Sequence, residues 1–206
     1  SLVGSEMCIR DRVWNSLKFC VIVATIQLVI TSLAAYAFAR LRFIGRKYGL
    51  MSLLVLQVFP NSMAVAGYYI LIYRFGLVDS SLALIFVLAG GSAYNIWLLK
   101  SYIDGLPVEL DEAAVIDGAG PISLFFKIIM PLLKPTMVTC FILQFMGVWS
   151  DFLTPLYLSS KSKMFPMTMA VYQFFGKNKS YWNYIFADIV LTCIPVVIVY
   201  MIGQKY

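Results

Sequence analysis

Five long apolar stretches constrain the fold of this chain more than any other feature of its sequence. They cover residues 14–39, 49–73, 81–99, 132–157 and 181–202. A helix rises about 1.5 Å per residue, so about 20 apolar residues cross the hydrocarbon core of a bilayer. Backbone polar groups in lipid must be hydrogen-bonded within the protein, and the alternating pattern of a membrane barrel is absent. The sequence therefore predicts an all-α, polytopic transmembrane helical bundle with about five spans.

Composition supports a membrane protein and argues against a nucleic-acid partner. Of the 206 residues, 61% are hydrophobic and 13% are charged, whereas a soluble domain carries about a quarter charged residues. Lipid must therefore cover most of the surface. The formal net charge is +6, and the charges fall in short breaks between the apolar stretches. We interpret them as topology determinants and headgroup contacts rather than as a nucleic-acid surface.

The residues that usually build metal and catalytic sites are sparse. The chain has no histidine, and its four cysteines show no metal-ligand spacing. We interpret the cysteines as small apolar residues packed among helices. The sequence therefore predicts no catalytic residue and no metal site.

The chain divides into two parts at its beginning. Residues 1–12 lack the apolar core of a signal peptide, and we interpret them as an anomalous, non-native leader. Residues 13–206 form one predicted transmembrane domain.

Basic residues indicate the orientation of the chain in the membrane. Arg40, Arg42, Arg46 and Lys47 lie within eight residues of one another, which is typical of a cytoplasmic loop. This orientation places the long break at residues 100–131 in the cytoplasm. It places the loop at residues 158–180 outside, although that loop also carries four lysines.

The break at residues 100–131 contains a polar, helix-forming segment. Pro107 suits a first helical turn, and three acidic residues follow it at the positive end of the helix dipole. Gly118 can end the helix in a left-handed conformation, and Pro121 can begin the next one. The pattern predicts a helix of about ten residues, roughly 15 Å long, that is joined by a glycine turn to the following span.

The spacing within this segment is specific. Glu112-Ala113-Ala114 is followed by three residues, Gly118, nine residues, Ile128, one residue and Met130-Pro131. The pattern resembles the cytoplasmic signature of binding-protein-dependent ABC importer permeases, E-A-A-x3-G-x9-I-x-L-P. Met130 stands where that family usually has leucine.

The resemblance implies a type I importer permease fold in which the short helix docks into a cleft on a separate ATPase subunit. Glu112 would be the polar contact, Ala113 and Ala114 the close-packing face, and Gly118 the turn. Ile128 and Pro131 would hold the next helix against the bundle. The residues assigned to ATPase coupling are thus Glu112, Ala113, Ala114, Gly118, Ile128 and Pro131.

The resemblance also implies partners and a location. The chain lacks a G-x-x-x-x-G-K-[ST] phosphate-binding loop, so it would bind no cofactor itself and ATP would be bound and hydrolysed on the partner. Further implied partners are a second permease subunit and a periplasmic or extracellular solute-binding protein. The protein would be a transport subunit, not an enzyme, in a bacterial or archaeal cytoplasmic membrane.

Weaker patterns favour the carbohydrate branch of the family. Residues 15–17 leading to residues 32–41 look like the second helix of maltose-type permeases, and residues 149–155 are similar to W-N-[DE]-F-L-x-P. They favour a sugar or oligosaccharide as the substrate. The family usually has six spans, so five predicted spans indicate a fragment of a longer chain.

Polar residues inside predicted spans are candidates for the substrate pathway, because such residues usually face a cavity or the bundle interior. Hydrogen bonding between helices is an equally good explanation for each of them. The candidates are Asn61, Gln144, Asn95, Gln57 and Trp149.

Three other functional classes compete with a sugar permease. A permease for an amino acid, a peptide or phosphate would carry the same cytoplasmic signature. An intramembrane enzyme would need a carboxylate pair such as Asp151 and Asp188, but no catalytic motif surrounds these residues. A stand-alone secondary transporter would need a complete bundle with internal repeats, which the sequence does not show.

Overall fold

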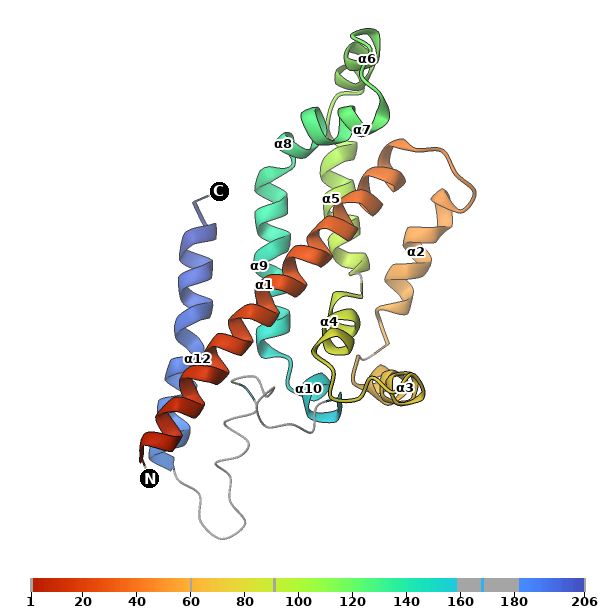
Figure 1. The fold of residues 1–206 in the computed structure, drawn as a ribbon. Coiled ribbons are helices and arrows are strands. Elements are labelled where there is room, and N and C mark those ends of the chain that lie inside the picture. Colours follow the sequence, from red (N-terminus) through yellow and green to blue (C-terminus); the bar gives the residue numbers. More distant parts are fainter. Residues whose placement is uncertain (1, 60, 91, 159–167, 169–181, 206) are drawn as a thin grey trace. The chain divides into compact units, whose positions relative to one another are not determined.

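The computed structural model describes the backbone of residues 2–59, 61–90, 92–158, 168 and 182–205. Side chains are described from Val13 onward within these ranges, except at positions 61, 62 and 184. Every regular element in the described part of the chain is a helix (Figure 1). The all-α class predicted from the sequence is confirmed.

The helices from α1 to α10 follow one another with short connections. The last element, α12, spans Trp182–Gly203. The others are α1 (Leu2–Arg40), α2 (Arg46–Leu56), α3 (Asn61–Arg74), α4 (Ser81–Ala89), α5 (Ala93–Asp104), α6 (Glu109–Ile116), α7 (Pro121–Leu124), the π-helix η1 (Phe125–Ile129), α8 (Met130–Leu132), α9 (Lys134–Ser150) and α10 (Leu153–Leu158).

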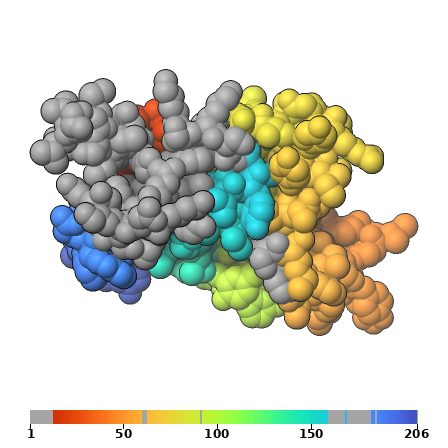
Figure 2. Space-filling model, turned by 90° about the horizontal axis from the view of Figure 1, so that it is seen from below, coloured from red at the N-terminus to blue at the C-terminus, as the bar shows by residue number. Residues whose placement is uncertain are grey.

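The chain forms two compact units, and each has its own core. The first unit comprises residues 1–25, 60–90 and 142–205, and the second comprises residues 26–59 and 91–141. In the first unit α10 packs against α3 and α4, and Figure 2 shows the cyan atoms of α10 against the gold and yellow atoms of those helices. In the second unit a buried cluster joins α1, α5 and the segment after α6, and it includes Ala35, Leu99, Ile103 and Ile129.

The predicted spans are only partly continuous helices. Residues 13–40 of α1 and residues 185–203 of α12 are long and apolar enough to cross a membrane, which agrees with the first and fifth predicted spans. Counting two bent helix pairs as single spans raises the number in the described residues from two to four. Of the roughly five predicted spans, the described residues thus contain two as continuous helices and two more as bent pairs.

The breaks have local chemical causes. The stretch at 49–73 ends its first helix at Leu56 and begins the next at Asn61. Pro60 has no N–H to donate and disfavours helical backbone at the residue before it. The stretch at 81–99 divides at Gly90 and Gly91, and Ser92 caps α5 by accepting a hydrogen bond from the Asn95 N–H. The stretch at 132–157 divides at Asp151, whose carboxylate accepts a 3.2 Å hydrogen bond from the Thr154 N–H.

Residues 2–12 continue α1 without a break. Their interpretation as a non-native leader stays a prediction.

Candidate functional site

The short polar helix exists, and its beginning is close to the predicted one. It is α6, Glu109–Ile116, with Glu109, Asp111 and Glu112 near its N-terminus. Pro107 lies just outside the helix, and its carbonyl accepts a 3.3 Å hydrogen bond from the Leu110 N–H. Helical structure thus begins two residues later than expected and covers 8 residues. The three carboxylates face the positive end of the helix dipole, which stabilises this end of α6.

The end of α6 is a Schellman motif closed by glycine. Gly118 has φ 81°, and its N–H donates to the Val115 carbonyl at 3.0 Å. The Ala119 N–H donates to the Ala114 carbonyl at 2.9 Å. These two bonds satisfy carbonyls that the helix end would leave unpaired. The predicted left-handed turn at Gly118 is confirmed, and so is the start of the next helix at Pro121.

One face of α6 is open to a partner. Positions spaced by three and four residues lie on the same side of a helix, and four such positions are exposed on α6. Ile116 has 85% of its surface exposed, although it is apolar. We call this set the outer stripe, and it consists of Glu109, Glu112, Ala113 and Ile116.

The opposite face of α6 packs on the chain itself. Ala114 is only 5% exposed and belongs to the core of the second unit. The structure therefore separates the two alanines of the signature, because Ala113 is exposed while Ala114 packs internally. Ile116 was not among the residues singled out from the sequence. The sequence feature that could have identified it is an apolar residue at the end of a polar segment, four residues after Glu112 and therefore on the same side of the helix.

An ion pair links α6 to the end of α1. The Arg40 Nε lies 2.6 Å from the Asp111 Oδ2, and each side chain is 13% exposed. The Arg40 Nη2 also donates to the Leu106 carbonyl at 3.1 Å. The basic break after α1 and the α6 segment therefore lie at the same end of the second unit, as the predicted orientation requires.

We expect Arg40→Gln or Asp111→Asn to lower the free energy of unfolding by about 2–3 kcal/mol. Either change leaves a mostly buried charge without its counterion, so the double variant should lose less than the sum of the single variants. Denaturant unfolding of the detergent-solubilised protein measures both effects. The more exposed pair Lys100–Asp104 is the control, and its removal should cost less than about 1 kcal/mol. Equal losses for the two pairs would contradict a special role for Arg40.

The segment after the turn contains an irregularity that the sequence did not predict. Ile128 lies in the π-helical stretch Phe125–Ile129 and packs against the core of the second unit. Pro131 is exposed and is the second residue of the next helical turn, α8. Pro131 has no N–H for the Lys127 carbonyl, and we attribute the widened turns before it to this missing bond. A bend of 78° follows at Leu133, directly before α9 begins at Lys134.

The candidate pathway residues fall in different units. Gln57 and Asn95 belong to the second unit, where the Gln57 Oε1 accepts a 3.0 Å hydrogen bond from the Tyr94 N–H and Asn95 is 4% exposed. Gln144 is half-buried in the first unit. The side chain of Asn61 lies outside the described residues. Their assignment to a pathway stays a prediction.

Trp149 has the contacts of a packing residue. It is 4% exposed, and its Nε1 donates to the Thr192 carbonyl at 3.1 Å. Its ring stacks on Phe145 with centroids 5.9 Å apart. These contacts favour hydrogen bonding between helices for this residue, and its assignment to the pathway stays a prediction.

Within the described residues, no group of three or more His, Cys, Asp or Glu side chains is placed to hold a metal ion. The candidate site in the described part of the chain is therefore α6 with its exposed face.

Comparison with known proteins agrees with this geometry. A family described as "binding-protein-dependent transport system inner membrane component" matches residues 27–206. The maltodextrin transport system permease protein MdxG of Bacillus subtilis is 32% identical over 193 residues, which are 93% of this chain and 69% of that protein. The maltose/maltodextrin permease protein MalG of Vibrio vulnificus is 31% identical over 94% of this chain and 67% of that protein.

Solved structures show the same fold. A bacterial ABC transporter involved in the import of the acidic polysaccharide alginate matches with a TM-score of 0.83 and 23% identity, over 97% of this chain and 75% of that chain. The MetNI methionine ABC transporter in inward facing conformations matches with a TM-score of 0.77 and 16% identity, over 98% and 95%.

The family accounts for the location and the chemistry of the chain. Its members are multi-pass proteins of the cytoplasmic membrane that act as permeases rather than enzymes. They bind no cofactor, and ATP is hydrolysed by partner ATPase subunits. The signature on α6, the helical fold and the match over residues 27–206 together establish that this chain belongs to the inner-membrane permeases of binding-protein-dependent ABC importers.

Proposed function

We propose that the chain forms half of a translocation pathway for a sugar or oligosaccharide and is coupled to a separate ATPase through α6. The observation that carries the coupling is the outer stripe. Glu112, Ala113 and Ile116 are exposed on one face of a helix whose other face is tied to the chain by the Arg40–Asp111 pair and by buried Ala114. A helix held in this way transmits a push from a partner, because its inner face cannot move independently of α1.

The composition of the outer stripe suits a protein partner. Ala113 adds little bulk, so another backbone can approach closely. Ile116 supplies exposed apolar area, and Glu112 supplies a charge at the rim of the contact. Gly118 sets the angle between α6 and the segment that follows it. Ile128 packs on the core beneath this segment, and Pro131 lies in the turn that leads to α9.

The substrate class rests on the relatives. Permeases of maltodextrin and of maltose/maltodextrin systems are about 30% identical over more than nine-tenths of this chain. A second permease subunit would supply the other half of the pathway, and a binding protein would deliver the sugar at the outer face. The alternative is a non-sugar solute, because the α6 signature is shared by permeases of many solutes.

We expect the reconstituted complex to take up maltodextrin when ATP is present inside and the binding protein outside. The assay uses proteoliposomes that contain this permease, its partner permease and the ATPase, with radiolabelled maltodextrin, methionine and phosphate in parallel. Maltodextrin uptake should exceed that of the other two by at least about tenfold, because a site built to hydrogen-bond hydroxyl groups rejects solutes that lack them. Preferential ATP-dependent uptake of methionine or phosphate would retain the permease role and overturn the sugar assignment.

A further inference from the structure

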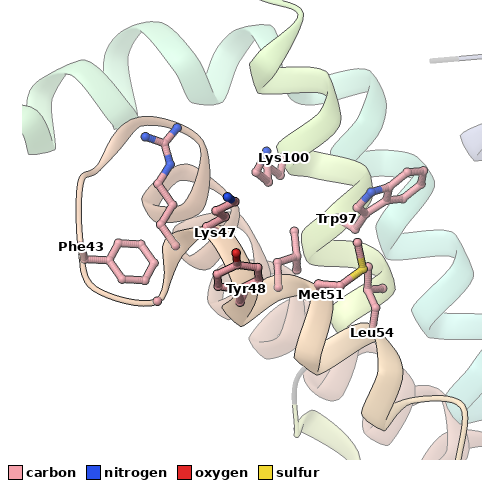
Figure 3. A pocket seen from close by; sticks show the side chains of 10 residues that line it. Phe43, Lys47, Tyr48, Met51, Leu54, Trp97 and Lys100 are labelled. Carbon is pink, nitrogen blue, oxygen red and sulfur yellow. The ribbon is translucent and has the colours of Figure 1, made fainter.

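A surface groove lies between α2 and α5 of the second unit and encloses about 690 Å³. Figure 3 shows Lys47 and Lys100 between Phe43 on one side and Met51, Leu54 and Trp97 on the other. The cationic lining residues are Arg46, Lys47 and Lys100, and the apolar ones are Phe43, Leu50, Met51, Leu54 and Trp97. We call the part with Met51, Leu54 and Trp97 the apolar end. The outer stripe of α6 contributes nothing to this groove, and none of the candidate pathway residues lines it.

The cationic end of the groove is fixed by the turn between α1 and α2. Gly45 has φ 94° and allows the sharp reversal. The Arg46 guanidinium then donates to the carbonyls of Phe38 and Ala39 at the end of α1, at 2.9 and 2.6 Å. These bonds anchor the first turn of α2 and set the position of Lys47.

The order of residues along α2 and α5 separates the charged side chains of these helices from their apolar ones. Lys47, Met51 and Leu54 are spaced along one face of α2, and Trp97 precedes Lys100 by one turn of α5. Because α2 runs away from the basic turn while α5 runs toward α6 (Figure 1), the start of α2 lies beside the end of α5. Lys47 and Lys100 therefore mark the same end of the groove.

The groove carries an excess of positive charge. Its described lining has three cations and no acidic residue. Lys100 forms an ion pair with Asp104 outside the lining, which offsets one of the charges. The Lys47 Nζ lies 5.2 Å above the ring of Tyr48, an interaction that leaves its charge available to an anion.

The apolar end is exposed, like much of the apolar surface of this chain. Met51 is 64% exposed and Trp97 is 44% exposed. A soluble anion would use the lysines and leave this apolar surface uncovered. An amphiphile with a negative headgroup would cover both ends.

We propose that this groove binds an anionic phospholipid, with its phosphate at Lys47 and Lys100 and an acyl chain along Met51, Leu54 and Trp97. A multi-pass membrane protein meets such lipids wherever a basic turn lies at the headgroup level. Trp97 suits this position because its ring is amphipathic and favours the membrane interface. The site would anchor the turn that joins α1 to α2, and it is independent of the substrate that the permease carries.

Fluorescence quenching at Trp97 tests the proposal. The intact importer complex is placed in phosphatidylcholine nanodiscs that contain increasing fractions of brominated phosphatidylglycerol or, separately, brominated phosphatidylcholine. The same titration with Trp97→Phe isolates the signal of this residue. Brominated phosphatidylglycerol should quench Trp97 at a several-fold lower mole fraction than brominated phosphatidylcholine. Equal quenching by the two lipids overturns the proposal. The same result is expected if a partner subunit occupies the groove in place of a lipid, so that case also counts against the proposal.

Charge variants identify the residues responsible. Lys47→Gln with Lys100→Gln should raise the required fraction of phosphatidylglycerol at least about fivefold, the effect of one full charge, because Asp104 offsets part of the charge of Lys100. The charge-matched control, Lys18→Gln with Lys134→Gln, changes two exposed lysines outside the lining and should leave the titration unchanged. Lys47→Arg with Lys100→Arg should also leave it unchanged. An equal shift in the control overturns the assignment to the groove.

A soluble competitor separates a lipid site from a free-anion site. Glycerol phosphate at millimolar concentration carries the same phosphate without the acyl chains, so it should not relieve the quenching. Relief by glycerol phosphate would identify a site for soluble anions and overturn the lipid proposal.

Discussion

Glu112→Lys is expected to lower ATP-dependent uptake about a hundredfold while the protein stays in the membrane at normal abundance. Glu112 is exposed on the outer stripe, so its replacement leaves the core of the second unit intact. A lysine there reverses the charge that the ATPase meets, and an unfavourable charge contact at an interface costs several kcal/mol. Uptake by proteoliposomes and co-purification of the ATPase should fall together.

Val115→Lys is the matched control for this variant. It also places a lysine on α6, at a side chain that is 61% exposed, but it lies off the outer stripe. Uptake by Val115→Lys should stay within about twofold of the unmodified protein, since surface substitutions away from a contact have small effects. If Glu112→Lys transports normally, or if both variants fail alike, the outer stripe is not the ATPase contact.

Gly118→Val is expected to reduce uptake nearly as strongly as Glu112→Lys, through the backbone rather than through charge. Gly118 has φ 81°, and the left-handed conformation costs a residue with a β-carbon about 1–2 kcal/mol. A β-branched residue is the least compatible with it. Apart from the adjacent residues, no atom lies within 4 Å of the position of an added β-carbon, so the expected loss comes from backbone strain and not from a clash of that carbon. The two hydrogen bonds of the Schellman motif should break. The orientation of α6, and so of the outer stripe, relative to α7 would then no longer be fixed.

Gly118→Asn separates backbone conformation from bulk. Asparagine tolerates the left-handed region, so this variant should keep most of the uptake although its side chain is as exposed as that of valine. Hydrogen exchange of the Gly118 and Ala119 amides should be faster in Gly118→Val and unchanged in Gly118→Asn. Equal loss in both variants would mean that the partner approaches the α-carbon itself, and normal uptake in Gly118→Val would exclude the turn from coupling.

Local chemistry made the α6 segment predictable. The acidic residues at its start, the glycine at its end and the proline after it act on backbone groups within a few positions. The helix, the left-handed turn and the next helix start could therefore be placed from the sequence. The same signature identified the family, because its residue types recur at fixed spacing over the 20 residues from Glu112 to Pro131.

Hydropathy was less reliable for the spans. Residues 49–73 are apolar throughout, yet the helix breaks between Leu56 and Asn61. An average over some 20 residues hides Pro60 and the paired glycines at 90 and 91, because one proline or glycine barely changes the sum. The free energy of a helix depends on single hydrogen bonds, so one such residue suffices to end it.

The sequence by itself determined the membrane class, the family and the short polar helix, since each follows from composition or from residues within one continuous segment of the chain. Only the tertiary structure decided which face of that helix is free. It turned Asp111 toward Arg40, buried Ala114 and left Ile116 exposed. It also brought Lys47 beside Lys100 across two helices. These outcomes depend on packing between segments tens of residues apart, which no local pattern of side chains encodes.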